Sequence, residues 1–164
     1  MKKFFRRVFI VFLCLISVLP MKVDAIDGEK IQWYDAGFTE ERMQQILDLN
    51  PQQNFSTRAT DLILTYNIAI AKNSTNSTYI DMVAKMFCTA SVVKCGFKKI
   101  ILQKRLSTSS SWTNALTLED LYYDGSDHAI GKTFSVPSGY QYRVVCTFYA
   151  KKSLLVTQKI EHTS

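Results

Sequence analysis

Three cysteines are the residues whose type and spacing could most readily do chemistry in this chain, once its first 25 residues are set aside. They are Cys88, Cys95 and Cys146. A zinc site needs four ligands, usually in pairs about two to four residues apart, and the chain's two histidines lie far from one another. We therefore expect no metal and no cofactor. In an exported chain we expect one disulfide and one free thiol instead.

The pairing of these cysteines is predicted from strand periodicity. Cys88 ends the inward row of one predicted strand, and Cys146 lies late in the inward row of another. Immunoglobulin domains join two facing strands across the sandwich in this way. We expect Cys88–Cys146 with Cys95 free. Cys95–Cys146 is the second choice, and three reduced, buried thiols are the third.

Four acids form the densest carboxylate cluster: Glu119, Asp120, Asp124 and Asp127. Paired carboxylates can act as general acid and base in a glycoside hydrolase. Their spacing fits no EF-hand, and the sequence has no nucleophile elbow and no glycine-rich phosphate loop. We predict no catalytic residue. A small secreted hydrolase that uses the Glu119–Asp127 carboxylates remains an alternative.

Basic side chains of the predicted sheet suggest a ligand face. Lys99 and Arg105 share one outward row, and Arg143 occupies the outward row of its own strand. Such residues can bind an anionic cell-wall polymer, a glycan or a protein. They equally serve to keep strand edges soluble and unpaired.

The first 25 residues have the layout of a secretory signal peptide. Lys2, Lys3, Arg6 and Arg7 precede the apolar run 8–19, which Pro20 ends, and residues 23–25 fit a cleavage site after Ala25. The apolar run is too short to span a bilayer, so we expect a secreted, extracellular chain with no membrane span after cleavage. The lysine-rich start also suggests a bacterial protein.

Cleavage removes most of the positive charge. The whole chain carries +6, and residues 1–25 account for +4 of it, which leaves +2 on the mature chain. The sequence therefore does not predict a nucleic-acid partner. The remaining charge is uneven, because residues 26–91 carry a net −3 and residues 92–164 a net +5.

The elements that must position these residues are one helix and then strands. Thr39 is predicted to cap a helix over residues 39–49, within an extension over residues 26–60 that is a pro-segment, a spacer or part of the fold. From residue 61 the hydrophobic period is two. About seven strands follow, near residues 62–70, 80–88, 100–106, 112–118, 130–136, 140–148 and 154–160. This pattern predicts a mainly β chain, with residues 61–164 forming a single antiparallel immunoglobulin-like β-sandwich.

Two finer expectations concern the domain's interior. We expect five residues to point between the sheets: Trp112, Tyr140, Tyr142, Val144 and Phe148. Thr117 and Asp120 have the spacing of a capping box, so residues 118–123 are predicted to form a helical turn between strands.

Several motifs of the second half recur together in a known group of proteins. They are Val93–Ile100 (VKCGFKKI), Gln103, Trp112, Gly139–Val144 (GYQYRV) and Tyr149–Lys152 (YAKK). Over residues 92–164 the chain resembles small proteins of unknown function that are secreted by Gram-positive Firmicutes, especially Clostridia. The resemblance implies secretion and supplies no catalytic residue.

The predictions together favour an exported, non-enzymatic binding or cell-surface interaction module. The hydrolase is the first alternative, and a secreted toxin or antimicrobial factor is the second.

Overall fold

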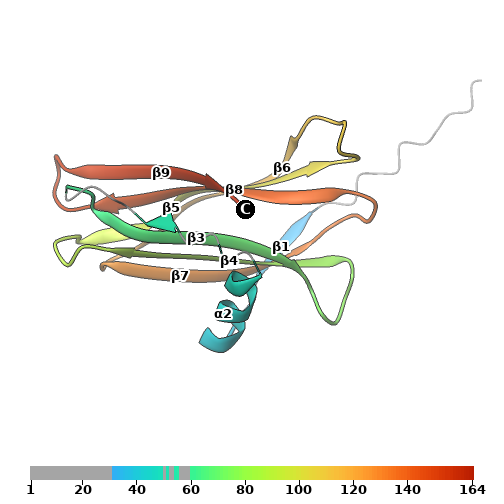
Figure 1. The fold of residues 1–164 in the computed structure, drawn as a ribbon, viewed down its shortest axis with the longest axis horizontal. Helices are drawn as coiled ribbons and strands as arrows, with labels where there is room; N and C mark the ends of the chain where they lie inside the picture. The colour runs from blue at the N-terminus through green and yellow to red at the C-terminus, as the bar shows by residue number, and fades with distance from the viewer. Residues whose placement is uncertain (1–30, 50, 52–53, 56–59) are drawn as a thin grey trace, which may run out of the picture.

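The protein is an antiparallel immunoglobulin-like β-sandwich, as the periodicity predicts. The structure, a computed structural model, describes residues 31–49, 51, 54–55 and 60–164. Two sheets lie face to face, and one helix lies against the outer side of the sheet that contains β3, β4 and β7 (Figure 1). The predicted signal peptide, residues 1–25, lies outside the described residues. No helix among the residues described has the length and apolar character that crossing a membrane requires.

Nine strands and one helix make up the described residues. The five-stranded sheet has the order β1-β7-β4-β3-β2, and the four-stranded sheet has the order β6-β5-β8-β9. The bounds are β1 Gln32–Asp35, α2 Glu40–Asp48, β2 Asn54–Phe55, β3 Ile63–Lys72, β4 Tyr79–Cys88, β5 Lys94–Arg105, β6 Thr113–Tyr123, β7 Asp127–Ser135, β8 Gln141–Lys151 and β9 Thr157–Thr163.

The seven long strands follow an immunoglobulin-like order. The first, second and fifth of them, β3, β4 and β7, are neighbours in one sheet, and the other four form the second sheet. The fourth long strand, β6, pairs with β5 rather than with β7, which distinguishes the fold from an antibody constant domain. Tyr142 near the start of β8 donates its hydroxyl to the Pro137 carbonyl at 2.7 Å, a contact like the tyrosine corner of immunoglobulin domains.

The core lies between the sheets, on the inward rows that the alternation predicts. Val144 and Phe148 are fully buried, and Tyr142 packs against the core. The predictions for Tyr140 and Trp112 are wrong. Tyr140 precedes β8 and is 39% exposed, and Trp112 lies over two arginines of the four-stranded sheet.

The predicted helical turn over residues 118–123 is also wrong, because this segment belongs to β6. Leu118 pairs with Ile100 of β5 and is buried in the core. Asp120 has a φ of 58° and lies opposite Lys98, and the register between β5 and β6 is the same on both sides of this position. Pairing along the whole of β5 therefore outweighs the local capping signal.

Gly96 marks where β5 and β6 come closest. Its φ is 145°, and a Cβ atom there would lie 2.3 Å from the Leu121 carbonyl oxygen. No L-residue side chain fits at that distance from backbone, so glycine is required at this position of β5.

The helix forms where the sequence predicts it. Thr39 is extended, and its hydroxyl accepts a hydrogen bond from the Arg42 amide at 3.3 Å. Ile46 and Leu47 form a small second core with Ala69 of β3 and Val83 of β4. Small residues let the helix segment approach closely, since a Cβ on Gly131 would lie 2.4 Å from the Phe38 ring.

The described part of the predicted extension is built into the sandwich. β1 pairs with β7, and β2 pairs with β3, so both strands extend the five-stranded sheet. A partly buried ion pair adds to this, because the half-buried Arg42 of α2 lies 3.1 Å from the Asp81 carboxylate, which is 1% exposed. Of the three roles that the sequence leaves open for the extension, these residues fulfil that of a structural part.

Candidate anion-binding face

Two of the three predicted ligand residues meet on the outer face of the four-stranded sheet. Arg105 of β5 pairs in register with Gln141 of β8, and Gln103 pairs with Arg143. Side chains two residues apart on one strand share a face, so both guanidinium groups lie on the same side of the sheet. The third predicted residue, Lys99, lies earlier in β5 than Arg105 and forms an ion pair with Glu119 at 3.1 Å.

Trp112 brings the two arginines into one cluster. The Cζ atom of Arg105 lies 4.3 Å from the centroid of the Trp112 ring, and the Cζ atom of Arg143 lies 4.5 Å from it. Contacts of a guanidinium with an indole at this range are favourable cation–π contacts. One aromatic ring therefore holds two like charges close together.

Glutamine side chains fix the same two guanidinium groups. The Nε atom of Arg105 donates to Gln141 Oε1 at 2.8 Å, and the Nε atom of Arg143 donates to Gln103 Oε1 at 2.8 Å. Gln103 in turn donates to Asn114 at 2.8 Å. We call the set Gln103, Arg105, Trp112, Gln141 and Arg143 the arginine–tryptophan patch.

The positive charge of the arginine–tryptophan patch has no carboxylate beside it. Among the described residues, the ion pairs involve other basic side chains, and neither Arg105 nor Arg143 is in one. The polar partners of both arginines are neutral. They are the two glutamine side chains and, for Arg105, also the Thr108 carbonyl, which accepts a hydrogen bond at 3.3 Å. Arginine stays protonated at any physiological pH, so the patch carries a charge of about +2.

A strand irregularity explains why periodicity alone places Trp112 in the core. Leu116 pairs with Leu102, whereas Asn114 pairs with Gln103, so Ala115 is skipped. The row of Leu116 and Leu118 faces inward, and Asn114 faces outward with Gln103. An extra residue in a strand turns every side chain beyond it to the other face.

A cavity of about 340 Å³ lies at one end of the sandwich, where Ile70 and Ile80 of the five-stranded sheet line it. Gln141 belongs to the patch and also lines this cavity, together with Tyr140 and Tyr142. Lys104 Nζ lies 4.8 Å from the Tyr140 ring centroid and adds a third basic group at the same end.

The four predicted acids are spread over separate contacts. Glu119 pairs with Lys99, and Asp124 pairs with Lys94 at 3.4 Å. Asp120 accepts a hydrogen bond from Tyr122 at 2.9 Å, and burial together with this carboxylate raises the pKa of Tyr122 to about 12. The cavity beside Tyr140 and the two cavities along α2 are lined by none of these acids.

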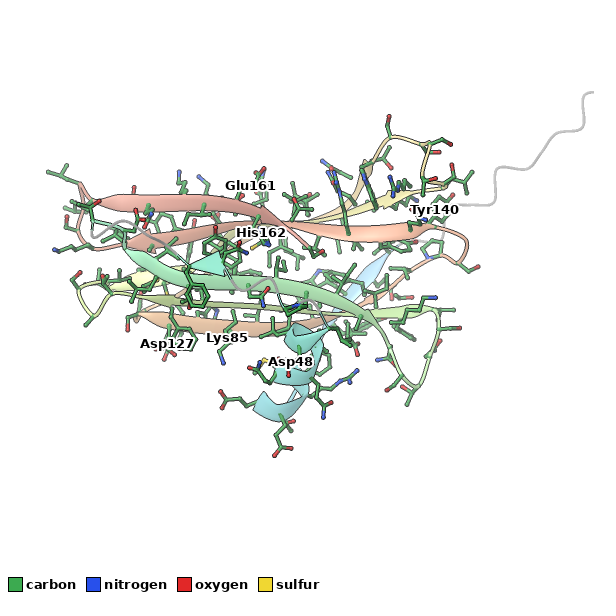
Figure 2. The ribbon with its side chains drawn as sticks, in the orientation of Figure 1. Asp48, Lys85, Asp127, Tyr140, Glu161 and His162 are labelled. Carbon is green, nitrogen blue, oxygen red and sulfur yellow. The ribbon has the colours of Figure 1, made fainter. Side chains whose placement is uncertain are left out.

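Another cavity lies between α2 and the outer side of β3 and β4. It measures about 360 Å³, and Asp48 and Lys85 both line it (Figure 2). Lys85 is already engaged, because its Nζ lies 3.6 Å from Glu40 and 5.3 Å from the Phe87 ring centroid. This cavity therefore offers less free charge than the arginine–tryptophan patch does.

The cysteines separate into a pair and a single residue. Cys88 and Cys95 are buried together between the sheets, and a hydrogen bond links their thiols. Cys146 is buried in β8 opposite Ile100, and burial raises the pKa of its thiol. This contact brings Cys88 to Cys95, whereas both disulfides expected from the sequence include Cys146.

Within the described residues, no group of three or more metal-ligating side chains comes together. In the comparisons with known proteins, no family model and no curated sequence matches the chain.

Proposed function

We propose that the protein is an exported, non-enzymatic binding module whose arginine–tryptophan patch takes an anionic polymer of the cell wall. One observation carries the proposal: two guanidinium groups are held 4.3 Å and 4.5 Å from one indole ring, and neither has a carboxylate partner among the described residues. Secretion follows from the predicted signal peptide, and the resemblance to small secreted Firmicutes proteins agrees with it.

The chemistry of the patch favours phosphate or carboxylate groups in the ligand. A guanidinium group forms paired hydrogen bonds with either oxyanion, and these charge-assisted bonds are about twice as strong as neutral ones. Glutamine holds the Nε atom of both arginines, and the Thr108 carbonyl holds Nη1 of Arg105, so Nη2 of Arg105 and the two Nη atoms of Arg143 are the groups left for a ligand. A polymer with regularly spaced anions can meet both arginines at once.

The arginine–tryptophan patch also limits the conformational entropy that is lost when a ligand binds. Long arginine side chains lose conformational freedom when a ligand fixes them, and that loss weakens binding. Here the indole ring and the two glutamines have already fixed both side chains, so less freedom is left to lose. The same argument does not apply to Lys98 or Lys152, which are exposed.

Binding of anionic polymers by the purified mature protein tests the proposal. We expect poly(glycerol phosphate) or polygalacturonate to bind, and the double variant R105Q/R143Q to bind about tenfold or more weakly. The phosphate arm and the carboxylate arm distinguish the two sources of negative charge.

The matched control is K98Q/K152Q, which removes the same two charges far from the patch. It should bind nearly as well as the wild type. Equal losses in both double variants would indicate general charge attraction and would contradict a defined site. No binding to either polymer by the wild type would reject the proposal.

A further inference from the structure

The contact between Cys88 and Cys95 lies at the end of the sandwich opposite the patch. Asp127, which acts electrostatically on both thiols, and Tyr140 beside the patch lie toward opposite ends of the molecule (Figure 2). Cys88 is the last residue of β4 in the five-stranded sheet, and Cys95 is the second residue of β5 in the four-stranded sheet. The two thiols therefore meet across the sandwich.

Backbone hydrogen bonds hold the chain on both sides of this contact. The Cys88 amide donates to the Ser126 carbonyl at 2.7 Å, and the Thr89 amide donates to the Leu62 carbonyl at 2.8 Å. The Val93 amide donates to the Lys151 carbonyl at 2.9 Å, directly before β5. The short link between the strands thus keeps the two sulfur atoms close to each other.

Cys146 is too far from Cys95 to compete for it. In the ladder between β5 and β8, Cys95 pairs with Ala150, whereas Cys146 pairs with Ile100. Four residues along β8 separate Cys146 from the position opposite Cys95, which is about 13 Å at the rise of a strand. A disulfide needs the two Cα atoms within about 7 Å.

We propose that Cys88 and Cys95 form a disulfide that joins the two sheets, and that Cys146 stays a buried free thiol. The bond closes a short loop over residues 88–95 and joins the C-terminal end of β4 to the start of β5. It would stabilise the exported protein without taking part in ligand binding.

The reaction is thiol–disulfide exchange with an external disulfide. The Cys95 thiolate attacks one sulfur of that disulfide, and the first external thiolate leaves. Cys88 then loses its proton to water and attacks Cys95 in the mixed disulfide, so the second external thiolate leaves. The two protein thiols lose two protons and two electrons, and the external disulfide is reduced to two thiols.

The environment of the pair decides the order of these steps. Once the two strands meet, the hydrogen bond from Cys88 lowers the pKa of Cys95 and raises that of Cys88, so Cys95 is the first nucleophile in a late, still open stage of folding. Cys95 is fully buried and Cys88 nearly so, which shields both from exchange in the folded protein. We therefore expect the bond to form while the chain folds.

A tryptic digest without reduction tests the bond directly, because trypsin cleaves after Lys94, between the two cysteines. The protein is unfolded, refolded with reduced and oxidised glutathione, and then alkylated in denaturant without a reductant before digestion, because Cys146 is buried in the folded protein. We expect the peptides 86–94 and 95–98 to remain joined and Cys146 to be alkylated. Three alkylated cysteines, or a bond from Cys146 to either partner, would overturn the proposal.

Melting in the presence of a reductant provides a second measurement. We expect dithiothreitol to lower the melting temperature of the wild type and of C146A by about 5–10 °C. The double variant C88A/C95A should melt at the same temperature with and without it. A wild type that does not respond to the reductant would contradict a stabilising bond.

Discussion

The surroundings of the two tryptophans Trp33 and Trp112 show how this fold uses the same contact in two ways. Trp33 belongs to β1, at the edge of the five-stranded sheet, and Lys132 Nζ lies 4.4 Å from its ring centroid. Trp112 precedes β6, at the edge of the four-stranded sheet, and two arginines lie at similar distances from its ring. Both rings therefore hold cations at the edge of a sheet.

The difference between them is a carboxylate. Lys132 is 5% exposed and forms an ion pair with Asp35, its partner in the ladder between β1 and β7. Arg105 and Arg143 instead donate hydrogen bonds to the neutral side chains of glutamines. A buried cation must be compensated by the protein itself, whereas a half-exposed pair can leave its charge for a ligand.

The ion pair between α2 and β4 is of the same kind as the one at Trp33, because a buried charge has its partner within the protein. Arg42 reaches the buried Asp81 carboxylate, which also accepts hydrogen bonds from Asn73 at 2.9 Å and from Thr133 at 3.0 Å. The two buried charges of the five-stranded sheet, Asp81 and Lys132, thus have partners within the protein, whereas the two arginines of the arginine–tryptophan patch are in no ion pair among the described residues. The predictions below test this contrast in order of decreasing effect.

Removal of the Asp81 carboxylate should have the largest effect on stability. D81A leaves Arg42, Asn73 and Thr133 without their shared acceptor, so we expect the free energy of unfolding to fall by about 3 kcal/mol. Urea denaturation measures this loss. E40A breaks an exposed ion pair and should cost less than about 0.5 kcal/mol. An equal effect of both variants would contradict the assignment of Asp81 as the main contact.

The Asp35–Lys132 pair should respond differently to the loss of each partner. D35A leaves a buried ammonium group without its carboxylate, and we expect a loss of about 1–2 kcal/mol in the free energy of unfolding. K132M replaces the ammonium with an apolar side chain of similar length and should change stability by less than about 1 kcal/mol. If K132M were the more damaging variant, the cation itself would be needed for packing.

Trp112 should matter more for binding than for folding. W112A removes two cation–π contacts that hold the arginines, so we expect about fivefold to tenfold weaker binding of an anionic polymer. The free energy of unfolding should fall by about 1 kcal/mol or less, because the ring lies outside the core. W33F is the control, and it should leave binding unchanged. Undiminished binding by W112A would show that the ring does not organise the patch.

A small pH effect should appear in stability and not in binding. Burial lowers the pKa of His162, whose Nε2 atom lies 3.1 Å from the Asn54 amide nitrogen, and it also lowers the pKa of His128. The unfolded chain then takes up protons at a higher pH than the folded chain. Stability should therefore fall as the pH drops below about 6.5, by less than about 1 kcal/mol for each histidine.

Urea denaturation between pH 7 and pH 5.5 measures this dependence, and H162Q should reduce it. Binding to the arginine–tryptophan patch should show no step over the same interval, since arginine does not titrate there. A step in binding that follows the histidines would contradict the proposed location of the site.

The sequence predicts the sandwich because apolar residues at every second position of a long strand are the residues that the core buries. It predicts the outward faces of Arg105 and Arg143 for the same reason. It does not predict Trp112 beside them, because the skipped Ala115 changes the face that side chains occupy. Thr117 and Asp120 mislead in a similar way, since local capping signals cannot report the pairing with β5.

The contacts that join distant segments are outside the reach of periodicity. Asp81 and Arg42 are 39 residues apart, and the acidic type of Asp81 next to the apolar residues Ile80 and Met82 is a signal that could have indicated a buried partner. Cys88 and Cys95 lie close in the sequence, but the crossing of the chain from one sheet to the other is what brings the thiols together.

Titration of the protein with an anionic polymer, followed by the indole Nε1–H signals, tests the central claim most directly. The chain contains two tryptophans, and each reports one of the two surroundings compared above. We predict that poly(glycerol phosphate) or polygalacturonate shifts the Trp112 signal in a saturable way and leaves the Trp33 signal in place. Shifts of both signals together, or of Trp33 alone, would contradict an anion-binding site at the arginine–tryptophan patch.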